Sequence, residues 1–378
     1  MPNVLMTGCF GNVGSNAVRY LMTLNQTLQR DDNPARVKLT CFEKDSPAAK
    51  ANWQELVHEF GENAFVTIWG DLLNEAQVKE AVKGQDAIIH LAAIIPPLAY
   101  KIPDVARKVN VDATKLLLDA GASQPKPPRF VYASSYSVQG NKNPNKSNPL
   151  MNGDTPLNPQ DSYAGHKAKC EVLVKQYPGE WTICRIGAVT VTAKAVLSGS
   201  SGGASTSEAN SMLFGIPANQ HRHGVHSADA GRAFGECAIT KNPVAGKILS
   251  IGGDSSWKVT SAAFGNVIFR SLGIGNLPTE VFRNPSPDND AAFYYEEWMD
   301  TTESQALLDF QKHTIQDWEN EMRQGVGMLR RSLVTMVSPL ARFFFARTSP
   351  HYRYNTGGGK DPLAEKSMIE IMGALKAE

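Results

Sequence analysis

The fold is decided by one stretch near the N-terminus, Val4-Leu5-Met6-Thr7-Gly8-Cys9-Phe10-Gly11-Asn12-Val13-Gly14. Its apolar start predicts a strand, and a pattern of helical period from Val13 to Leu28 follows at once. Glycines at such a junction allow a tight turn, close approach of the backbone to a pyrophosphate, and close packing of helix against strand. Free N–H groups at the start of the helix favour a phosphate group. The stretch therefore predicts a strand, a phosphate-binding turn and a helix.

The same alternation continues through the first half of the chain. Helical patterns such as residues 105–120 lie between apolar runs that predict further strands at residues 37–42, 65–69, 87–91, 130–132 and 181–186. Strands that alternate with helices need crossover connections, which give parallel sheets with helices on both faces. We predict an α/β fold, a doubly wound parallel sheet of the Rossmann type, with a smaller C-terminal substrate-binding region.

Composition excludes several classes of protein. The 378 residues include 38 basic and 37 acidic ones, so the net charge of +1 does not favour nucleic acid as a partner. Five scattered cysteines without a CxxC spacing indicate reduced thiols in the cytoplasm and no disulfide framework. We find no signal peptide and no run of 18 apolar residues, and therefore expect no transmembrane helix.

An acidic residue, Glu43, stands just after the second predicted strand. A carboxylate there can accept hydrogen bonds from the ribose hydroxyls of an adenine dinucleotide, and it repels a 2′-phosphate. This favours NAD as the cofactor. Lys44 beside it could bind a 2′-phosphate, so NADP stays possible, and a plain surface charge pair is the alternative.

A tyrosine and a lysine lie four residues apart in Tyr163-Ala164-Gly165-His166-Lys167. At this spacing on a helix the two side chains share one face. A free phenol has a pKa of about 10. A nearby ammonium favours the phenolate, which makes Tyr163 a candidate general base. Taken alone, the pattern is common by chance and also suits a solvated helix face.

Several motifs follow one another in a fixed order along the chain. After the three glycines come Gly70-Asp71-Leu72, His90-Leu91-Ala92-Ala93, Asn110-Val111, Tyr132-Ala133-Ser134-Ser135 and the Tyr163–Lys167 pair. The set resembles the extended short-chain dehydrogenase/reductases, the NAD-dependent epimerase/dehydratase family. The resemblance covers about residues 3–310 and is weak after that.

The resemblance implies a cofactor site. The N-terminal turn would hold the pyrophosphate, the loop after the third strand would meet the adenine, and the loop after the fourth would line the dinucleotide cleft. Asn110 would bond backbone near the fourth strand. The residues so assigned to the cofactor, together with Glu43, are Gly8, Gly11, Asn12, Val13, Gly14, Asp71, Leu72, Ala92, Ala93, Tyr163 and Lys167.

The resemblance also implies a catalytic group. The catalytic serine of the family lies five residues before a glycine, here Gly140, which selects Ser135 over Ser134. Tyr163 would be the acid/base, and Lys167 would bind the nicotinamide ribose and tune Tyr163. We therefore predict an NAD-dependent oxidoreductase that interconverts a secondary alcohol and a ketone.

Two alternative functions stay open. An NAD-dependent epimerase of a sugar or sugar nucleotide would use the same residues, but such epimerases usually carry Arg-x-x-Asn where this chain reads Arg185-Ile186-Gly187-Ala188. A non-catalytic, nucleotide-sensing member of the fold commonly lacks the tyrosine or the lysine, and both are present here. Dehydratases carry Asp-Glu after the catalytic hydroxyl, whereas Tyr136-Ser137 follow Ser135, so dehydration is not expected.

We divide the chain into three parts. Residues 1–187 form an NAD-binding Rossmann domain, residues 188–321 a substrate-binding region that in part returns to it, and residues 322–378 a basic amphipathic extension. The Ser- and Gly-rich segment from Ser198 to Ser211 is the expected substrate lid. Pairing into a homodimer through the Tyr163 helix is usual in proteins that the chain resembles.

The histidines do not predict a metal site. His221, His223 and His226 have no interleaved Asp, Glu or Cys. His226 and Asp229 resemble an H-x-x-D-x-A element of the family that is mostly structural.

Charge is uneven towards the C-terminus. Residues 277–321 carry eleven acids against two basic residues, and residues 322–360 carry seven basic residues and no acid. On a 3.6-residue helix, Arg331, Thr335, Ser338 and Arg342 lie opposite an apolar side made of Leu329, Leu333, Met336, Val337, Leu340, Phe343 and Phe344.

The apolar side of this helix has two possible neighbours. It packs on the preceding, acidic part of the chain, or it rests on an anionic membrane surface through residues 329–347, with the run Phe343–Phe345 as an anchor. In the second case an apolar, sterol-like substrate would reach the active site from the bilayer. Pro339 would kink or divide the helix.

Overall fold

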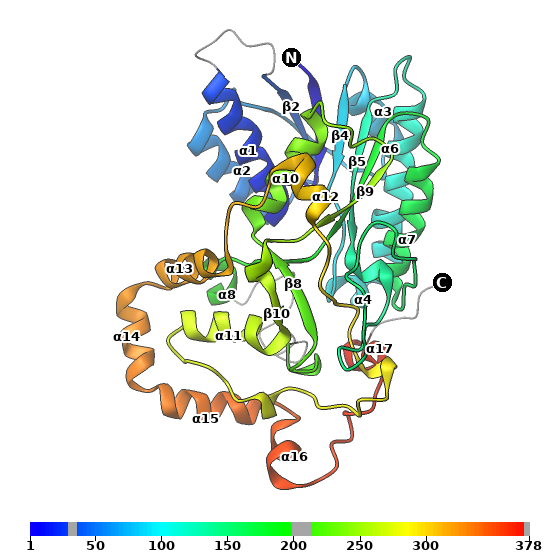
Figure 1. Ribbon diagram of the computed structural model, residues 1–378. Coiled ribbons are helices and arrows are strands. Elements are labelled where there is room, and N and C mark those ends of the chain that lie inside the picture. Colours follow the sequence, from blue (N-terminus) through cyan, green and yellow to red (C-terminus); the bar gives the residue numbers. More distant parts are fainter. Residues whose placement is uncertain (29–35, 199–212, 374–378) are drawn as a thin grey trace.

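The computed structural model describes residues 1–28, 36–198 and 213–373 (Figure 1). Its centre is a seven-stranded sheet in the order β3-β2-β1-β4-β5-β6-β9, and all neighbours pair in parallel. The strands are β1 (Asn3–Thr7), β2 (Lys38–Glu43), β3 (Val66–Trp69), β4 (Ala87–His90), β5 (Arg129–Ser135), β6 (Trp181–Ile186) and β9 (Lys247–Ile251). The predicted doubly wound sheet is confirmed.

Helices cover both faces of this sheet (Figure 1). Successive strand residues point to opposite faces, so Val4 and Met6 contribute to one apolar core and Leu5 to the other. The first core is shared with α1 (Asn12–Leu28), α2 (Pro47–Phe60), α10 (Ser227–Ile239) and α12 (Thr302–Leu308). The second is shared with α3 (Glu75–Val82), α6 (Ala113–Ala122) and α7 (Ser162–Lys175).

The chain after β6 builds a second, smaller unit below the large sheet in Figure 1. Its three strands, in the order β10-β8-β7, are β10 (Lys258–Thr260), β8 (His221–Val225) and β7 (Ala188–Val189). Trp257 and Trp318 lie in a core shared by α8 (Ala193–Ser198), α11 (Ser261–Ser271) and α13 (Ile315–Val326). Because α10 and β9 also come from this half of the chain, the Rossmann sheet is completed only after residue 247.

The segment predicted as one helix at residues 105–120 is interrupted. It consists of α5 (Pro103–Arg107), a π-helical turn at Lys108–Asp112 and α6. A single π turn inside a helix changes the hydrogen-bond pattern over only a few residues, and the sequence pattern does not show it. Short elements complete the middle of the chain: α4 (Leu98–Lys101) and 3₁₀ turns at Tyr136–Gln139, Ser255–Trp257, Thr279–Val281 and Asp290–Ala292.

In the described part of the basic extension, four helices follow α13: α14 (Met328–Met336), α15 (Ser338–Thr348), α16 (Tyr352–Gly357) and α17 (Met368–Met372). Pro339 lies in the first turn of α15, and the helix is divided there into two, as expected. Among the described residues no helix is long and apolar enough to cross a membrane. The expected lid, apart from Ser198, lies outside the described residues.

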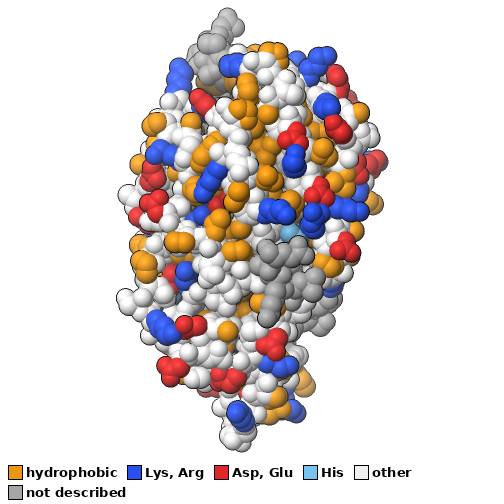
Figure 2. All heavy atoms as spheres, turned by 90° about the vertical axis from the view of Figure 1, so that its right-hand side faces the viewer, with side chains coloured by type: hydrophobic (Ala, Val, Ile, Leu, Met, Phe, Trp, Pro, Cys, Tyr) orange, Lys and Arg blue, Asp and Glu red, His pale blue; other side chains and the backbone are white. Residues whose placement is uncertain are grey.

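Figure 2 shows the side of the molecule that is on the right in Figure 1. Lys, Arg, Asp and Glu side chains are interspersed there with scattered apolar ones. This is the ordinary surface of a protein with almost balanced charge.

Helix α10 packs on α1 through two glycines. A Cβ at Gly231 would lie 2.5 Å from the backbone nitrogen of Ala17, and one at Gly235 would lie 2.6 Å from the Tyr20 ring. No side chain larger than hydrogen fits at these positions without movement of the helices. α10 therefore braces the helix whose N-terminus carries the glycine turn.

We predict that Gly231→Ala lowers the free energy of unfolding by about 1–3 kcal/mol, because the new methyl group forces α10 away from α1. Urea unfolding followed by circular dichroism measures the change. Gly357→Ala is the matched control, since a Cβ at Gly357 meets no atom within 4 Å, and it should change stability by no more than about 0.5 kcal/mol. Equal stability of the two variants would show that α10 and α1 tolerate a wider spacing.

Candidate active site

The glycine turn lies between the end of β1 and the start of α1. Gly8 has a φ of 71°, and a Cβ there would lie 2.6 Å from the Ala92 nitrogen. A Cβ at Gly14 would overlap the carbonyl oxygen of Gly8. At Gly11, in contrast, a Cβ would meet only that oxygen, at 3.5 Å. Gly8 and Gly14 are thus required by the turn itself, while Gly11 leaves an open stretch of backbone for a ligand.

The turn is held in place by two side chains from other segments and by one of its own. The Glu43 carboxylate accepts the N–H groups of Phe10 (3.2 Å) and Lys44 (3.1 Å). Asn52 Nδ2 donates to the Phe10 carbonyl (2.7 Å), and Asn12 Nδ2 donates to the Thr190 carbonyl (2.8 Å). Burial raises the pKa of Glu43, and its bonds to backbone N–H groups oppose that rise. The hydrogen bond from Phe10 to Glu43 therefore links the turn to the end of β2.

A chain of hydrogen bonds runs behind the turn through a buried histidine. His90 Nδ1 lies 2.7 Å from the Thr7 hydroxyl, and His90 Nε2 lies 2.9 Å from the Thr114 hydroxyl, which donates to the Asn110 carbonyl. Burial, with the Lys167 charge, lowers the pKa of His90 to about 3, so its ring is neutral. Its partners place the proton on Nε2. The motif that contains His90 was recognised in the sequence, but this role was not.

The loop after β4 is fixed by Asn110, which lies in the π turn. Asn110 Oδ1 accepts the Ile94 N–H (2.7 Å) and Asn110 Nδ2 donates to the Ile94 carbonyl (2.9 Å). The backbone role expected of Asn110 is therefore present. These bonds hold the half-buried Ala92 and Ala93 against the glycine turn.

The loop after β3 is more open. Asp71 is exposed, and its carboxylate accepts the Leu73 N–H (2.9 Å). Leu72 is half-buried and packs against the core under α3 and α6. Asp71 and Leu72 come shortly after β3, which pairs with β2. The last residue of β2 is Glu43.

The two serines at the end of β5 have different surroundings. Ser134 Oγ donates to Glu171 Oε1 (2.6 Å), and the buried Glu171 carboxylate also pairs with Arg185 through two hydrogen bonds of 3.0 and 2.9 Å. Ser135 Oγ accepts the Ser137 N–H (3.2 Å), and its hydroxyl faces the Tyr163 phenol. Ser134 thus belongs to a buried ion pair, and Ser135 is the serine next to the tyrosine.

Helix α7 presents Tyr163 and Lys167 to the end of β5. Asp161 caps the helix by accepting the Ala164 N–H (2.9 Å). Lys167 Nζ donates to the Ala133 carbonyl (2.6 Å) and lies 6.0 Å from the centre of the Tyr163 ring. The lysine and tyrosine share one helix face, as their spacing predicts.

Burial shifts the pKa of both groups. It lowers the pKa of Lys167 to about 8, because the ammonium is removed from water. Burial and then the charge of Asp161 raise the pKa of Tyr163 above its usual 10, and the Ser135 hydroxyl opposes that rise. At neutral pH the tyrosine is therefore a phenol in the ligand-free protein, ready to donate a proton.

A cavity of about 10 Å³ lies beside this group, lined by Tyr100, Asn141, Asp161 and Tyr295 and covered by α17 through Met368 and Met372. The oxygens Asp161 Oδ2, Tyr100 OH and Asn141 Oδ1 form no hydrogen bond of ordinary length within the described residues. The sequence analysis missed these residues because they come from four separate segments.

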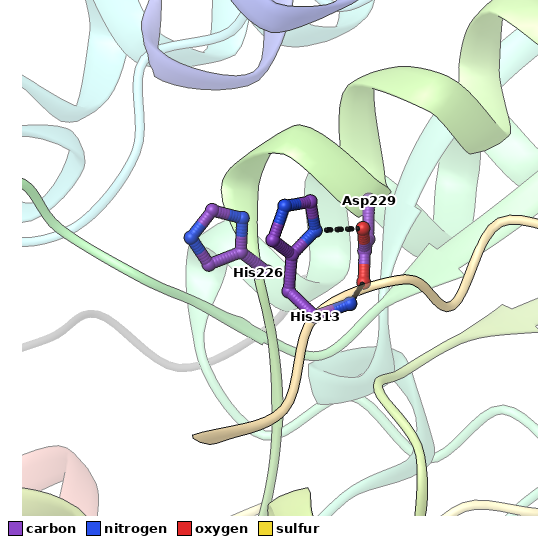
Figure 3. Close-up of side chains that lie close together, drawn as sticks. All are labelled: His226, Asp229 and His313. Atoms are coloured by element: carbon purple, nitrogen blue, oxygen red, sulfur yellow. Dashed lines mark hydrogen bonds and ion pairs between the residues drawn. The ribbon is translucent and has the colours of Figure 1, made fainter. Parts of the chain in front are cut away.

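Figure 3 shows His226, Asp229 and His313 side by side. Their nitrogen and oxygen atoms lie within 4.8 Å of one another. Asp229 Oδ1 pairs with His313 Nδ1 (2.6 Å), and Asp229 Oδ2 accepts the N–H groups of Lys312 and His313. His226 Nδ1 accepts the Ala228 N–H (3.3 Å), and His226 Nε2 contacts Glu321 (3.0 Å). The cluster is a hydrogen-bond network that fastens α10 to the segment before α13.

His221 and His223, which lie on β8, also contact other groups. His221 contacts Glu297 (2.5 Å) and stacks on Trp298, with 3.9 Å between ring centres. His223 accepts the Met299 N–H (3.0 Å) and donates to the Gly253 carbonyl (2.9 Å), and burial lowers its pKa to about 4. His221, His223 and His226 therefore do not share one site.

The glycine turn on its Rossmann sheet, with a serine, tyrosine and lysine grouped at the end of β5, is matched by one family. A sequence model of the NAD dependent epimerase/dehydratase family matches residues 4–193. The chain belongs to this family. The match ends at the start of α8, so most of the small sheet and the whole basic extension lie outside it.

The curated relatives are similar in sequence to about half of this chain. D-erythronate dehydrogenase of Cupriavidus necator is 32% identical over 177 residues, which are 46% of this chain and 50% of that protein. The 3 beta-hydroxysteroid dehydrogenase type 7 of Mus musculus is 31% identical over 180 residues, which are 46% of this chain and 44% of that protein. The chain thus spans about half the length of these relatives.

Solved structures extend the likeness in fold further. UDP-glucuronic acid 4-epimerase from Bacillus cereus has a TM-score of 0.64 at 20% identity, over 86% of this chain and 99% of that one. DesIV, a dTDP-glucose 4,6-dehydratase from Streptomyces venezuelae, has a TM-score of 0.65 at 20% identity, over 89% and 99%. The likeness in fold to these structures therefore extends beyond the residues that the family model matches.

We predict that Gly11→Ala weakens NADH binding by about tenfold or more at unchanged melting temperature, because the added methyl group occupies the open backbone that the pyrophosphate would approach. Gly14→Ala is the comparison: its methyl group overlaps the Gly8 carbonyl, so it should lower the melting temperature. Protein fluorescence during titration with NADH measures the affinity. Full NADH affinity in Gly11→Ala would mean that the dinucleotide does not lie on this turn.

Proposed function

We propose that the protein is an NAD-dependent oxidoreductase that interconverts a secondary alcohol and a ketone. The observation that supports this most strongly is the grouping of Ser135, Tyr163 and Lys167 at the end of β5, beside the loop after β4 that packs on the glycine turn. Membership of an NAD-dependent family agrees with the proposal.

The residues of the turn suit NAD. Gly11 leaves its backbone accessible, and Asn12 and Val13 begin α1, whose free N–H groups and dipole favour a phosphate. Glu43, at the end of β2, is placed for the adenosine ribose and disfavours the 2′-phosphate of NADP. When bound, NAD supplies the acceptor for the carbinol hydride.

Proton transfer is assigned to Tyr163. In oxidation its phenolate takes the hydroxyl proton of the alcohol, and in reduction the phenol returns a proton to the developing alkoxide. Ser135 donates a hydrogen bond to the same substrate oxygen, where charge develops. The Lys167 ammonium stabilises the phenolate, and its hydrogen bond to Ala133 orients it.

Tyr163→Phe should lower turnover by about a thousandfold or more while NADH affinity stays within about twofold, because only the transferable proton is lost. Steady-state rates measure turnover, and fluorescence titration measures NADH affinity. Turnover within about tenfold of the wild type would remove Tyr163 from the mechanism.

The two serines form a matched pair of variants. Ser135→Ala should reduce turnover by about a hundredfold at unchanged stability, since one hydrogen bond to the developing oxyanion disappears. Ser134→Ala should keep its turnover and lose about 1–3 kcal/mol of stability, because the buried Glu171 carboxylate loses a donor. The opposite pattern would assign the catalytic role to Ser134.

The pH dependence of the two directions should differ. The raised pKa of Tyr163 leaves little phenolate at neutral pH, so alcohol oxidation should accelerate as the pH rises from about 6 to about 9, and ketone reduction should not. Above about pH 8 the rise should become less steep, because Lys167, with a pKa of about 8, loses its charge. Oxidation that slows with rising pH over this range would contradict the role of the Tyr163 phenolate.

We further propose an apolar, sterol-like substrate. Tyr136, Ile216, Tyr294, Tyr295 and Met368 belong to one buried apolar cluster, and Tyr136 directly follows Ser135, so apolar and aromatic side chains lie near the candidate site. The relatives support two substrate classes, since their names include a D-erythronate dehydrogenase and 3 beta-hydroxysteroid dehydrogenases.

Absorbance at 340 nm with NAD and either a 3β-hydroxysteroid or D-erythronate separates these classes. Steady NADH formation with the steroid supports the apolar substrate, and NADH formation with D-erythronate alone contradicts it. Tyr163→Phe is the control in each case. Conversion of a sugar nucleotide without net NADH would instead identify an epimerase.

A further inference from the structure

Helices α14 and α15 lie at the outer edge of the molecule (Figure 1). They carry an exposed apolar surface. We call this surface the outer face; its residues, between 50% and 82% exposed, are Met328, Leu329, Leu333, Met336, Val337, Leu340, Phe343 and Phe344. The described chain has nine other exposed large hydrophobic side chains, and these are spread from Met1 to Leu197. Such a concentration within one short stretch indicates an interaction surface.

The opposite side of the two helices packs against the preceding region of the chain. Val334, Ala341, Phe345 and Ala346 pack into the apolar core around Phe269 and Phe282. The Phe345 ring lies 5.8 Å from the Phe269 ring in an edge-on arrangement. The Thr335 hydroxyl approaches the Gly273 carbonyl (3.4 Å).

The expectation that the apolar side packs on the preceding region is therefore wrong. Four other residues of α14 and α15 pack into the core of this region, and the outer face is left exposed. Of the three consecutive phenylalanines, Phe343 and Phe344 are exposed and Phe345 is the one that anchors the helix to the protein.

The charged residues of α14 and α15 all have one sign. Arg330, Arg342 and Arg347 are exposed, and within the described residues none of them pairs with a carboxylate. Arg347 instead lies over the Phe343 ring, 3.4 Å from its centre. Among the described arginines and lysines of the basic stretch, Arg323 alone has a salt bridge, to Glu319, and this lies before α14 begins. No acid occurs between residues 322 and 360 to offset these charges.

We propose that the outer face binds the surface of an anionic lipid bilayer. Apolar side chains on two consecutive helices would enter the boundary of the acyl chains, and the arginines beside them would meet lipid phosphates. A second copy of the chain fits less well, because a two-fold contact places the same arginines opposite one another with no acid to pair with them. The proposal does not depend on the catalytic chemistry.

Co-sedimentation of the full-length protein with vesicles tests the proposal. Binding is expected to phosphatidylcholine vesicles that contain phosphatidylserine, with little binding to phosphatidylcholine alone. It should weaken between low salt and about 1 M salt, where the screening length falls to about 3 Å.

Two sets of substitutions separate the apolar and the charged contributions. Leu333→Ser/Leu340→Ser/Phe344→Ser removes apolar surface, and Arg330→Gln/Arg342→Gln/Arg347→Gln removes charge. Each should reduce vesicle affinity about tenfold or more, at unchanged melting temperature and NADH affinity, because all six side chains are exposed. The matched controls are exposed residues elsewhere, Val66→Thr/Leu150→Gln/Val172→Thr and Lys83→Gln/Lys126→Gln/Lys175→Gln, and they should bind as the wild type does.

Three results would overturn the proposal. The first is no binding to anionic vesicles at low salt. The second is binding that the apolar substitutions leave unchanged, which would be adsorption by charge alone. The third is self-association in analytical ultracentrifugation that the apolar substitutions abolish, without vesicle binding, which would make the outer face an interface between two copies.

Discussion

The site depends on how closely the glycine turn packs between β1, β4 and α1. Gly8 lies against the backbone at Ala92, and Gly14 lies against the Gly8 carbonyl, so neither position has room for a side chain. This contact sets the distance between the first helix and the sheet and leaves the backbone at Gly11 open. The close contact of α10 with α1 holds the same helix from its other side. The stretch of backbone that we propose for the pyrophosphate is thus left open by the packing of the backbone itself.

Buried polar groups connect this turn to the proposed catalytic residues. The Thr7–His90–Thr114–Asn110 chain joins the end of β1 to the loop after β4. The Ser134–Glu171–Arg185 group joins β5, α7 and β6, which leaves Ser135 facing Tyr163. Buried groups of this kind are costly unless each one is satisfied, and they therefore specify a single arrangement. The position of the tyrosine follows from these partners as much as from its own helix.

Much of this arrangement is predictable from sequence, because it rests on local patterns. Apolar runs locate the strands, glycine spacing locates the turn, and the four-residue spacing places Tyr163 and Lys167 on one face. What escapes prediction depends on contacts between distant segments: the bonds from Glu43 to the Phe10 backbone, the His90 chain, and Asp161 with Tyr100 beside the active site. The apolar side of α14 and α15 was predicted, but not its orientation, because other residues complete the core around Phe269.

The central claim is that the glycine turn and the Ser135, Tyr163 and Lys167 group form one site for a dinucleotide. A crystal structure of the protein grown with NADH tests this most directly. The account predicts that the pyrophosphate lies on the backbone at Gly11 and the start of α1, with the adenosine ribose at Glu43 and the nicotinamide beside Tyr163. A dinucleotide bound elsewhere, or bound at the turn with its nicotinamide directed away from Tyr163, would contradict it.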